Sequence, residues 1–114
     1  MKIEIITDAI SKDVLREIAQ EFYGDMIKAT VDVEKQILAV GGEWHMDSNN
    51  VLIDNGSNQP DIWGINIYID RENDDRLEYV SLINIRPLQG NRTMELRNEE
   101  LRNKIKAIVN RFIV

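Results

Sequence analysis

The chain contains no cysteine among its 114 residues. Disulfide bridges, thiol nucleophiles, zinc sites built from thiolates and iron–sulfur clusters are therefore excluded. No apolar run approaches the roughly 20 residues that a membrane-spanning helix needs. The first residues, MKIEIITDAISKD, have no basic start followed by a long apolar stretch, and no small-residue cleavage site follows them. We therefore expect a cytoplasmic protein that does not associate with membranes.

Aromatic residues are also scarce, at 6% of the sequence, and there is a single histidine. The hydrophobic share of 43% and the charged share of 30% match an ordinary globular protein. The length is that of one domain, and the sequence has no internal repeats, linkers or low-complexity segments. We therefore expect a single domain over residues 1–114.

Charge is unevenly distributed along the chain. Residues 1–85 hold 7 basic and 17 acidic side chains, whereas residues 86–114 hold 7 basic and 3 acidic ones. We expect the basic segment to pack against the acidic body or against a second subunit. A nucleic-acid partner would also suit a basic segment, but the acidic remainder would repel phosphate, so we do not favour it.

Two helices are predicted from apolar residues that recur every three and four positions. In residues 11–24 Ser11 provides an N-cap and Gly24 a C-terminal stop. In residues 98–112 Asn98 provides the cap, acidic residues begin the helix and Arg111 ends it, as the helix dipole prefers. These are the N-terminal and the C-terminal helix of the predicted fold.

The remaining apolar segments are predicted to be strands. Residues 3–6, 62–69 and 77–86 read as strands, and residues 51–61 as a short apolar run and a surface loop. Residues 26–46 fit both a strand period and a helix period, but β-branched residues and the Gly41–Gly42 pair favour two strands, 26–34 and 37–46. Strands 62–69 and 77–86 are apolar on nearly both faces, which favours the centre of the sheet. The predicted fold class is α+β, with a mostly antiparallel sheet of about four to five strands packed with an N-terminal and a C-terminal helix.

The segment GGEWHMD holds the first candidate site. If it is extended, Glu43, His45 and Asp47 share one face, because side chains alternate along a strand. Such a trio could form an acid–base pair or bind a divalent metal. Polar residues at every second position also describe the wet face of an edge strand with Trp44 and Met46 packed beneath. We assign no metal and no cofactor.

The segment SLINIRPLQGNR holds the second candidate site. Asn84 and Arg86 share a face near a strand end, and with Arg92 they could bind a small anion. The alternative is that Arg86 forms an internal ion pair with Glu43 or Asp47. Trp63 could offer an aromatic platform to a ligand, although burial in the core is the simpler interpretation.

Seven short motifs carry a resemblance across most of the chain: GDM, VDVE, GGEWHMD, NGS, WGIN, SLINIRP and GNR. Together they resemble a small uncharacterised bacterial protein family of unknown function. The resemblance implies no activity, because the family has none assigned. It marks these positions as matching the family motifs: His45, Asp47, Trp63, Asn66, Asn84 and Arg86. The family usually has a small residue where this chain has Met46.

Three functions remain open from the sequence. We favour a non-catalytic structural or interaction module that forms a homo-oligomer. The first alternative is a small-ligand or hydrolase-like site in which His45 acts as general base and Arg86 anchors an anion, with Glu43, Asp47 and Asn84 beside them. The second alternative is nucleic-acid binding through the basic C-terminal segment, namely Arg92, Arg97, Arg102, Lys104, Lys106 and Arg111.

Overall fold

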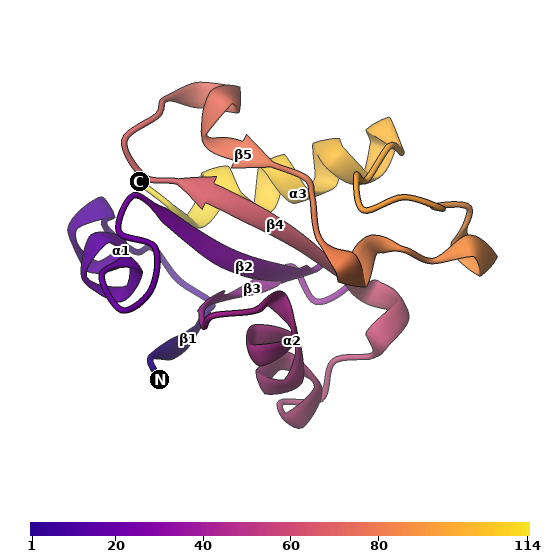
Figure 1. Ribbon diagram of the computed structural model, residues 1–114, viewed down its shortest axis with the longest axis horizontal. Coiled ribbons are helices and arrows are strands. Elements are labelled where there is room, and N and C mark those ends of the chain that lie inside the picture. The colour runs from indigo at the N-terminus through magenta and orange to yellow at the C-terminus, as the bar shows by residue number, and fades with distance from the viewer.

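The computed structural model describes all residues, 1–114, and has the predicted α+β fold. Five strands form one antiparallel sheet in the order β1-β3-β2-β4-β5 (Figure 1). The elements are β1 (Ile3–Ile6), α1 (Lys12–Ala19), β2 (Met26–Asp32), β3 (Ile37–Gly41), α2 (His45–Asp54), β4 (Ile62–Tyr68), β5 (Leu77–Glu78) and α3 (Glu99–Phe112). None of the helices combines the length and the apolar character needed to cross a membrane.

The two predicted helices are confirmed, together with their capping residues. The Ser11 hydroxyl accepts a hydrogen bond from Val14 N at 3.3 Å, and Asn98 Oδ1 accepts one from Leu101 N at 2.9 Å. Helix α1 ends at Ala19, earlier than predicted, and a turn carries the chain to Gly24, whose φ is +79°. A glycine adopts this left-handed conformation without steric cost, so Gly24 ends the turn that follows the helix rather than the helix itself.

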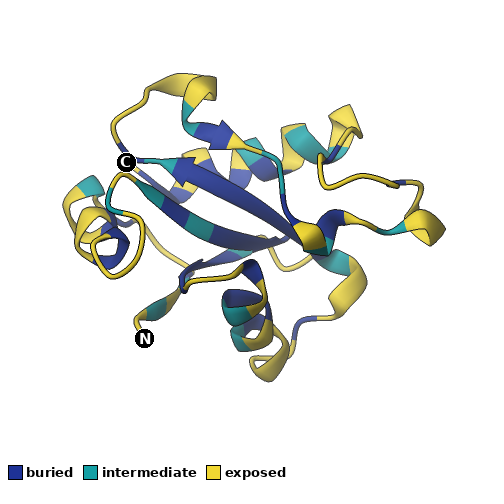
Figure 2. Ribbon diagram, in the orientation of Figure 1, coloured by how far each residue is buried: buried dark blue, intermediate teal, exposed yellow.

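The sheet is covered on both faces. Helices α1 and α3 pack on one face over the larger core, which includes Leu15, Trp63, Ile65 and Ile105. Helix α2 covers the other face, where a smaller core forms around Leu52 and Ile62. Figure 2 shows β2 and β4 buried along most of their length, with exposed residues on the helices and in the connecting loops. The central strand is β2, so the prediction that 62–69 and 77–86 form the centre is wrong for the second segment.

The predicted hairpin of residues 26–46 is confirmed only in its first part. Strands β2 and β3 pair antiparallel, and Asp32 Oδ1 stabilises the turn between them by accepting hydrogen bonds from Glu34 N and Lys35 N, both at 2.9 Å. The second strand ends at Gly41 instead of residue 46. Gly41 and Gly42 have φ values of +112° and +95°, which turn the chain out of the sheet before α2.

The predicted strand 77–86 is also much shorter than expected. Only Leu77 and Glu78 form β5, and the chain then makes a short 3₁₀ turn over Leu82–Asn84. The Ser81 hydroxyl accepts a hydrogen bond from Ile83 N at 3.2 Å. Such local side-chain bonds compete with the ladder of a sheet, so the apolar pattern alone did not make this segment a strand.

Candidate functional site

The outer edge of β4 is completed by side chains where β5 ends. The Asn84 Oδ1 accepts a hydrogen bond from Gly64 N at 2.8 Å, and its Nδ2 donates to Gly64 O at 3.0 Å. Asn84 is fully buried, so its amide supplies the pair of hydrogen bonds that a neighbouring strand would make. Gly64 allows the segment from Ser81 to Asn84 to lie this close to β4, because a side chain on residue 64 would place its Cβ 2.5 Å from Ser81 Cβ.

Arg86 binds backbone carbonyls at the beginning of β4, next to the contacts made by Asn84. Its Nε donates to Ile83 O at 2.9 Å, its Nη1 donates to Gln59 O at 2.9 Å, and its Nη2 donates to Ile62 O. The guanidinium also lies over the ring of Trp63, with its carbon 4.3 Å from the ring centroid. Burial lowers the pKa of Arg86 from its ordinary value. The guanidinium therefore holds the end of β4 rather than reaching out to solvent.

These contacts correct the geometry expected around Arg86. The ion pair predicted with Glu43 or Asp47 is not formed, because the donors of Arg86 go to backbone carbonyls. Trp63 is buried beneath the guanidinium, so its ring is not an open platform for a ligand. Arg92 is exposed beyond the turn and makes no ion pair.

The predicted trio of Glu43, His45 and Asp47 does not share a strand face, because α2 begins at His45. The Asp47 Oδ2 accepts hydrogen bonds from Glu43 N at 3.0 Å and from Trp44 N at 2.9 Å. Asp47 therefore caps the start of α2, where a carboxylate is also favoured by the helix dipole. Glu43 is exposed before the helix, and only His45 turns inward.

His45 is buried on the α2 face of the sheet. Its Nε2 lies 2.8 Å from Ile65 O, and since a carbonyl can only accept, Nε2 carries the proton. Burial and then the charge of Lys28 lower the pKa of His45 to about 4, against weaker raising effects of Ile65 O, Asn66 and Glu78. The imidazole is therefore neutral at pH 7. The other main candidate, Arg86, lies over the Trp63 ring, which belongs to the core on the opposite face of the sheet from His45.

One concave surface contains His45 and is lined mostly by apolar side chains. We call it the His45 pocket; its volume is about 380 Å³. Its lining consists of Lys28, Trp44, His45, Met46, Asn66, Val80, Ser81, Leu82, Ile83 and Met94. Several of the apolar residues are unusually exposed, with Trp44 at 62%, Met46 at 47%, Leu82 at 71% and Met94 at 44%. Exposed apolar groups gathered around a hollow are typical of binding surfaces.

A short series of polar side-chain contacts begins in this pocket. The Lys28 Nζ lies 3.5 Å from Asn66 Oδ1, and Asn66 Nδ2 donates to Glu78 Oε1 at 2.8 Å. Burial lowers the pKa of Lys28, and the Glu78 carboxylate opposes this shift. Lys28 is the only side chain lining the pocket that carries a charge at pH 7. The predicted candidate Asn66 therefore does meet His45, whereas Asn84 and Arg86 serve the edge of β4.

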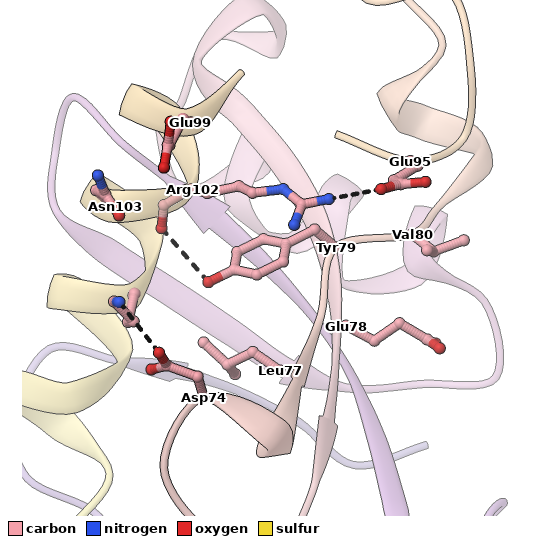
Figure 3. Close-up of a pocket in the computed structure, with 10 residues that line it drawn as sticks. Asp74, Leu77, Glu78, Tyr79, Val80, Glu95, Glu99, Arg102 and Asn103 are labelled. Carbon is pink, nitrogen blue, oxygen red and sulfur yellow. Dashed lines mark hydrogen bonds and ion pairs between the residues drawn. The ribbon is translucent and has the colours of Figure 1, made fainter. Parts of the chain in front are cut away.

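A second pocket, of about 400 Å³, lies on the other side of residues 77–80 and is mainly polar (Figure 3). Arg102 occupies its centre, with Nη2 2.9 Å from Glu95 Oε1 and the guanidinium over the Tyr79 ring. Lys106 Nζ lies 3.4 Å from Asp74 Oδ2. Figure 3 shows the Glu78 side chain pointing away from these groups. The two cations of α3 that line this pocket are thus paired with carboxylates of the same chain.

Other site chemistry is limited. No group of three or more His, Asp or Glu side chains is arranged to hold a metal ion. The apolar rim was missed by sequence reasoning, which placed Trp44 and Met46 beneath a strand. No apolar periodicity marks this helix in the sequence, because only Leu52 is apolar among its buried residues His45, Ser48, Asn49 and Leu52.

Comparison with known proteins identifies one matching family. A family model described as "Protein of unknown function (DUF5674)" matches residues 4–112. Neither the curated proteins nor the solved structures contain a match to the chain.

Proposed function

Because the chain belongs to the DUF5674 family of proteins of unknown function, we propose a function from its geometry: a non-catalytic interaction module that self-associates through the His45 pocket. The observation that carries this proposal is the exposed apolar rim of Trp44, Met46, Leu82 and Met94 around that pocket. Covering such a rim removes apolar surface from water, and this is the main favourable term in association.

Most of the polar candidate side chains form hydrogen bonds that stabilise the fold, which supports a role without catalysis. Asp47 caps α2, and Asn84 and Arg86 satisfy backbone groups at the edge of β4. Of the predicted trio only His45 lines a pocket, and its pKa of about 4 makes it a weak proton acceptor. A general base works best with a pKa near the operating pH, so this histidine is poorly matched to proton abstraction at pH 7.

The charge pattern supports a second copy as the partner. Residues 36–70, which include α2 and the Trp44 side of the rim, hold five acidic side chains and no Lys or Arg. Residues 79–94, which form the opposite side of the rim, hold two arginines and no acidic side chain. Two copies can therefore place the acidic segment of one against the basic segment of the other.

Replacing Trp44 tests this proposal. We expect Trp44→Ser to raise the dimer dissociation constant at least about 10-fold, because large aromatic side chains dominate association energy. The monomer should stay folded, since Trp44 is exposed and serine is a favourable residue before a helix. Sedimentation equilibrium over a range of protein concentrations measures the constant.

Phe22→Ser is the matched control, because Phe22 is an exposed aromatic residue that does not line the pocket. It should leave the dissociation constant unchanged. A wild-type protein that remains monomeric into the high micromolar range would overturn the proposal.

Lys28 favours a second candidate function, the binding of a small apolar anion in the same pocket. Its amine is half-buried and faces a largely apolar hollow, an arrangement that suits an apolar ligand with one negative group. Asn66 and the neutral His45 would provide further polar contacts at the base.

A fluorescent aromatic sulfonate, 8-anilinonaphthalene sulfonate, is a suitable probe for this candidate. We expect Lys28→Met to weaken its binding about fivefold, because the variant removes the attraction between unlike charges. Lys2→Met, which removes an exposed lysine outside the pocket, is the control. Equal fluorescence titrations for all three proteins would count against the anion site.

A further inference from the structure

The turn between Arg86 and Asn91 is held rigidly away from the body of the sheet. Arg86 N donates to Asn91 O, and Asn91 N donates to Arg86 O at 3.0 Å, which closes a small loop. Pro87 begins the loop, and Gly90 closes it with a φ of +82°. In addition, Gln89 Nε2 donates to Pro60 O at 2.9 Å. The loop in Figure 1 is the orange segment that projects beyond the end of the sheet.

Leu88 lies at the tip of this loop and is fully exposed, with a relative exposure of 103%. An isolated exposed leucine needs no explanation. This one is presented on a loop whose backbone and flanking side chains are fixed by hydrogen bonds, including those of the Arg86 side chain. A preorganised apolar tip loses little conformational entropy when it becomes buried against a partner.

We propose that two copies of this chain form a symmetric dimer in which Leu88 of each copy occupies the His45 pocket of the other. The proposal rests on the self-association proposed above and assigns the group that fills the pocket. The pocket, of about 380 Å³, opens between apolar side chains, and Leu88 supplies the complementary apolar group.

Charge complementarity identifies the second copy as the occupant. Leu88 is followed by the exposed Arg92, and the segment from residue 79 to residue 94 contains no acidic residue. On the pocket side, α2 is preceded by the exposed Glu43 and contains Asp47 and Asp54 without any basic residue. Insertion of Leu88 would therefore bring a basic segment next to the acidic side chains on and before α2, while the leucine itself meets the apolar lining of the pocket. The one positive charge of the lining, Lys28, is linked through Asn66 to the Glu78 carboxylate.

Symmetry doubles every such contact. In a two-fold dimer the same pair of surfaces meets twice, so two leucines are buried in two pockets. The exposed rim residues Leu82 and Met94 belong to the same stretch of chain as the loop, and they would be covered together with it.

The absence of cysteine allows a direct crosslinking test. Leu88→Cys and Met46→Cys are prepared separately and mixed under mild oxidation. We expect a disulfide-linked heterodimer, because Met46 lines the pocket that Leu88 would enter. A mixture of Leu88→Cys with Val14→Cys is the control, since Val14 is exposed on α1 and lies on the other face of the sheet.

The dimer dissociation constant of Leu88→Ser separates this inference from the proposed function. We expect the constant to rise at least about 10-fold, whereas Val14→Ser leaves it unchanged. If wild type dimerises, Leu88→Ser dimerises equally well and the Met46 pair gives no more crosslink than the Val14 pair, the insertion of Leu88 is wrong and self-association stands. If wild type does not dimerise, both proposals are wrong.

Discussion

Lowering the pH from 7 to 4 is expected to reduce the free energy of unfolding by about 3 kcal/mol through His45 alone. The folded state holds this histidine neutral, with a pKa of about 4 against an ordinary value of 6.5. Burial is the main cause, and the nearby positive charge of Lys28 adds to it. Protonation of the folded protein would place a second positive charge beside Lys28 in a largely buried site.

The sign of this change in the free energy of unfolding depends on which state, folded or unfolded, binds the proton at the higher pH. As the pH falls through about 6.5, the unfolded chain becomes protonated at His45 while the folded chain does not. Unfolding is then favoured progressively, by about 2 kcal/mol at pH 5. Well below pH 4 both states carry the proton, so this residue causes no further loss.

His45→Gln is the control for this pH effect, because glutamine keeps a donor for Ile65 O but does not titrate. Urea unfolding at several pH values between 7 and 5 measures the effect in a range where most carboxylates stay ionised. The single histidine also gives one imidazole signal by NMR, which should titrate below pH 5 in the folded protein. A stability difference between wild type and variant that does not change with pH would show that His45 is not held neutral.

Asn84→Ala is expected to lower the free energy of unfolding by about 3 kcal/mol. The substitution leaves the N–H and the carbonyl of Gly64 without partners in a buried position. It also removes the weaker hydrogen bond from Asn84 Nδ2 to Met94 O, at 3.3 Å. Alanine can supply none of these contacts, and water has little access to the site because Asn84 is fully buried.

Asn103→Ala is the matched control, because Asn103 is exposed on α3 and makes no side-chain hydrogen bond within the chain. Its stability should be close to that of wild type or slightly higher, as alanine favours helices. Amide exchange adds a local measure: Gly64 N–H should lose its protection in Asn84→Ala. If urea unfolding places the two variants within about 0.5 kcal/mol of each other, the Asn84 amide does not hold the edge of β4.

The start of α2 illustrates how far the sequence determines the fold. Strands β2 and β3 were predictable because β-branched residues alternate with polar ones, but the second strand was drawn five residues too long. The helix escaped prediction because its buried side holds His45, Ser48 and Asn49, which are polar. These residues find partners only in the folded chain, such as Thr30 Oγ1, which donates to Ser48 Oγ at 3.0 Å. A hydrophobic pattern cannot register a helix whose buried face is polar.

Asn84 and Arg86 are a second example of contacts that the sequence could not predict. Their unusual position in an apolar segment was visible in the sequence, which left an anion site and an internal ion pair open. The tertiary structure shows another arrangement, in which both side chains act as substitutes for a missing strand along β4. No spacing rule predicts this, because the backbone groups of Gln59, Ile62 and Gly64 that they bind lie 20 to 27 residues earlier in the chain.

The sequence by itself determined the class of the fold, its two capped helices and most of its strands, because periodicity and capping are local properties of the chain. It also excluded thiol chemistry, because there is no cysteine. Only the tertiary structure decided that His45 lies in an apolar pocket apart from Arg86, and that Trp44, Met46, Leu82 and Met94 gather around it. Those residues come from two distant segments, and their meeting depends on how α2 and residues 79–94 pack against β4, which is a property of the whole fold.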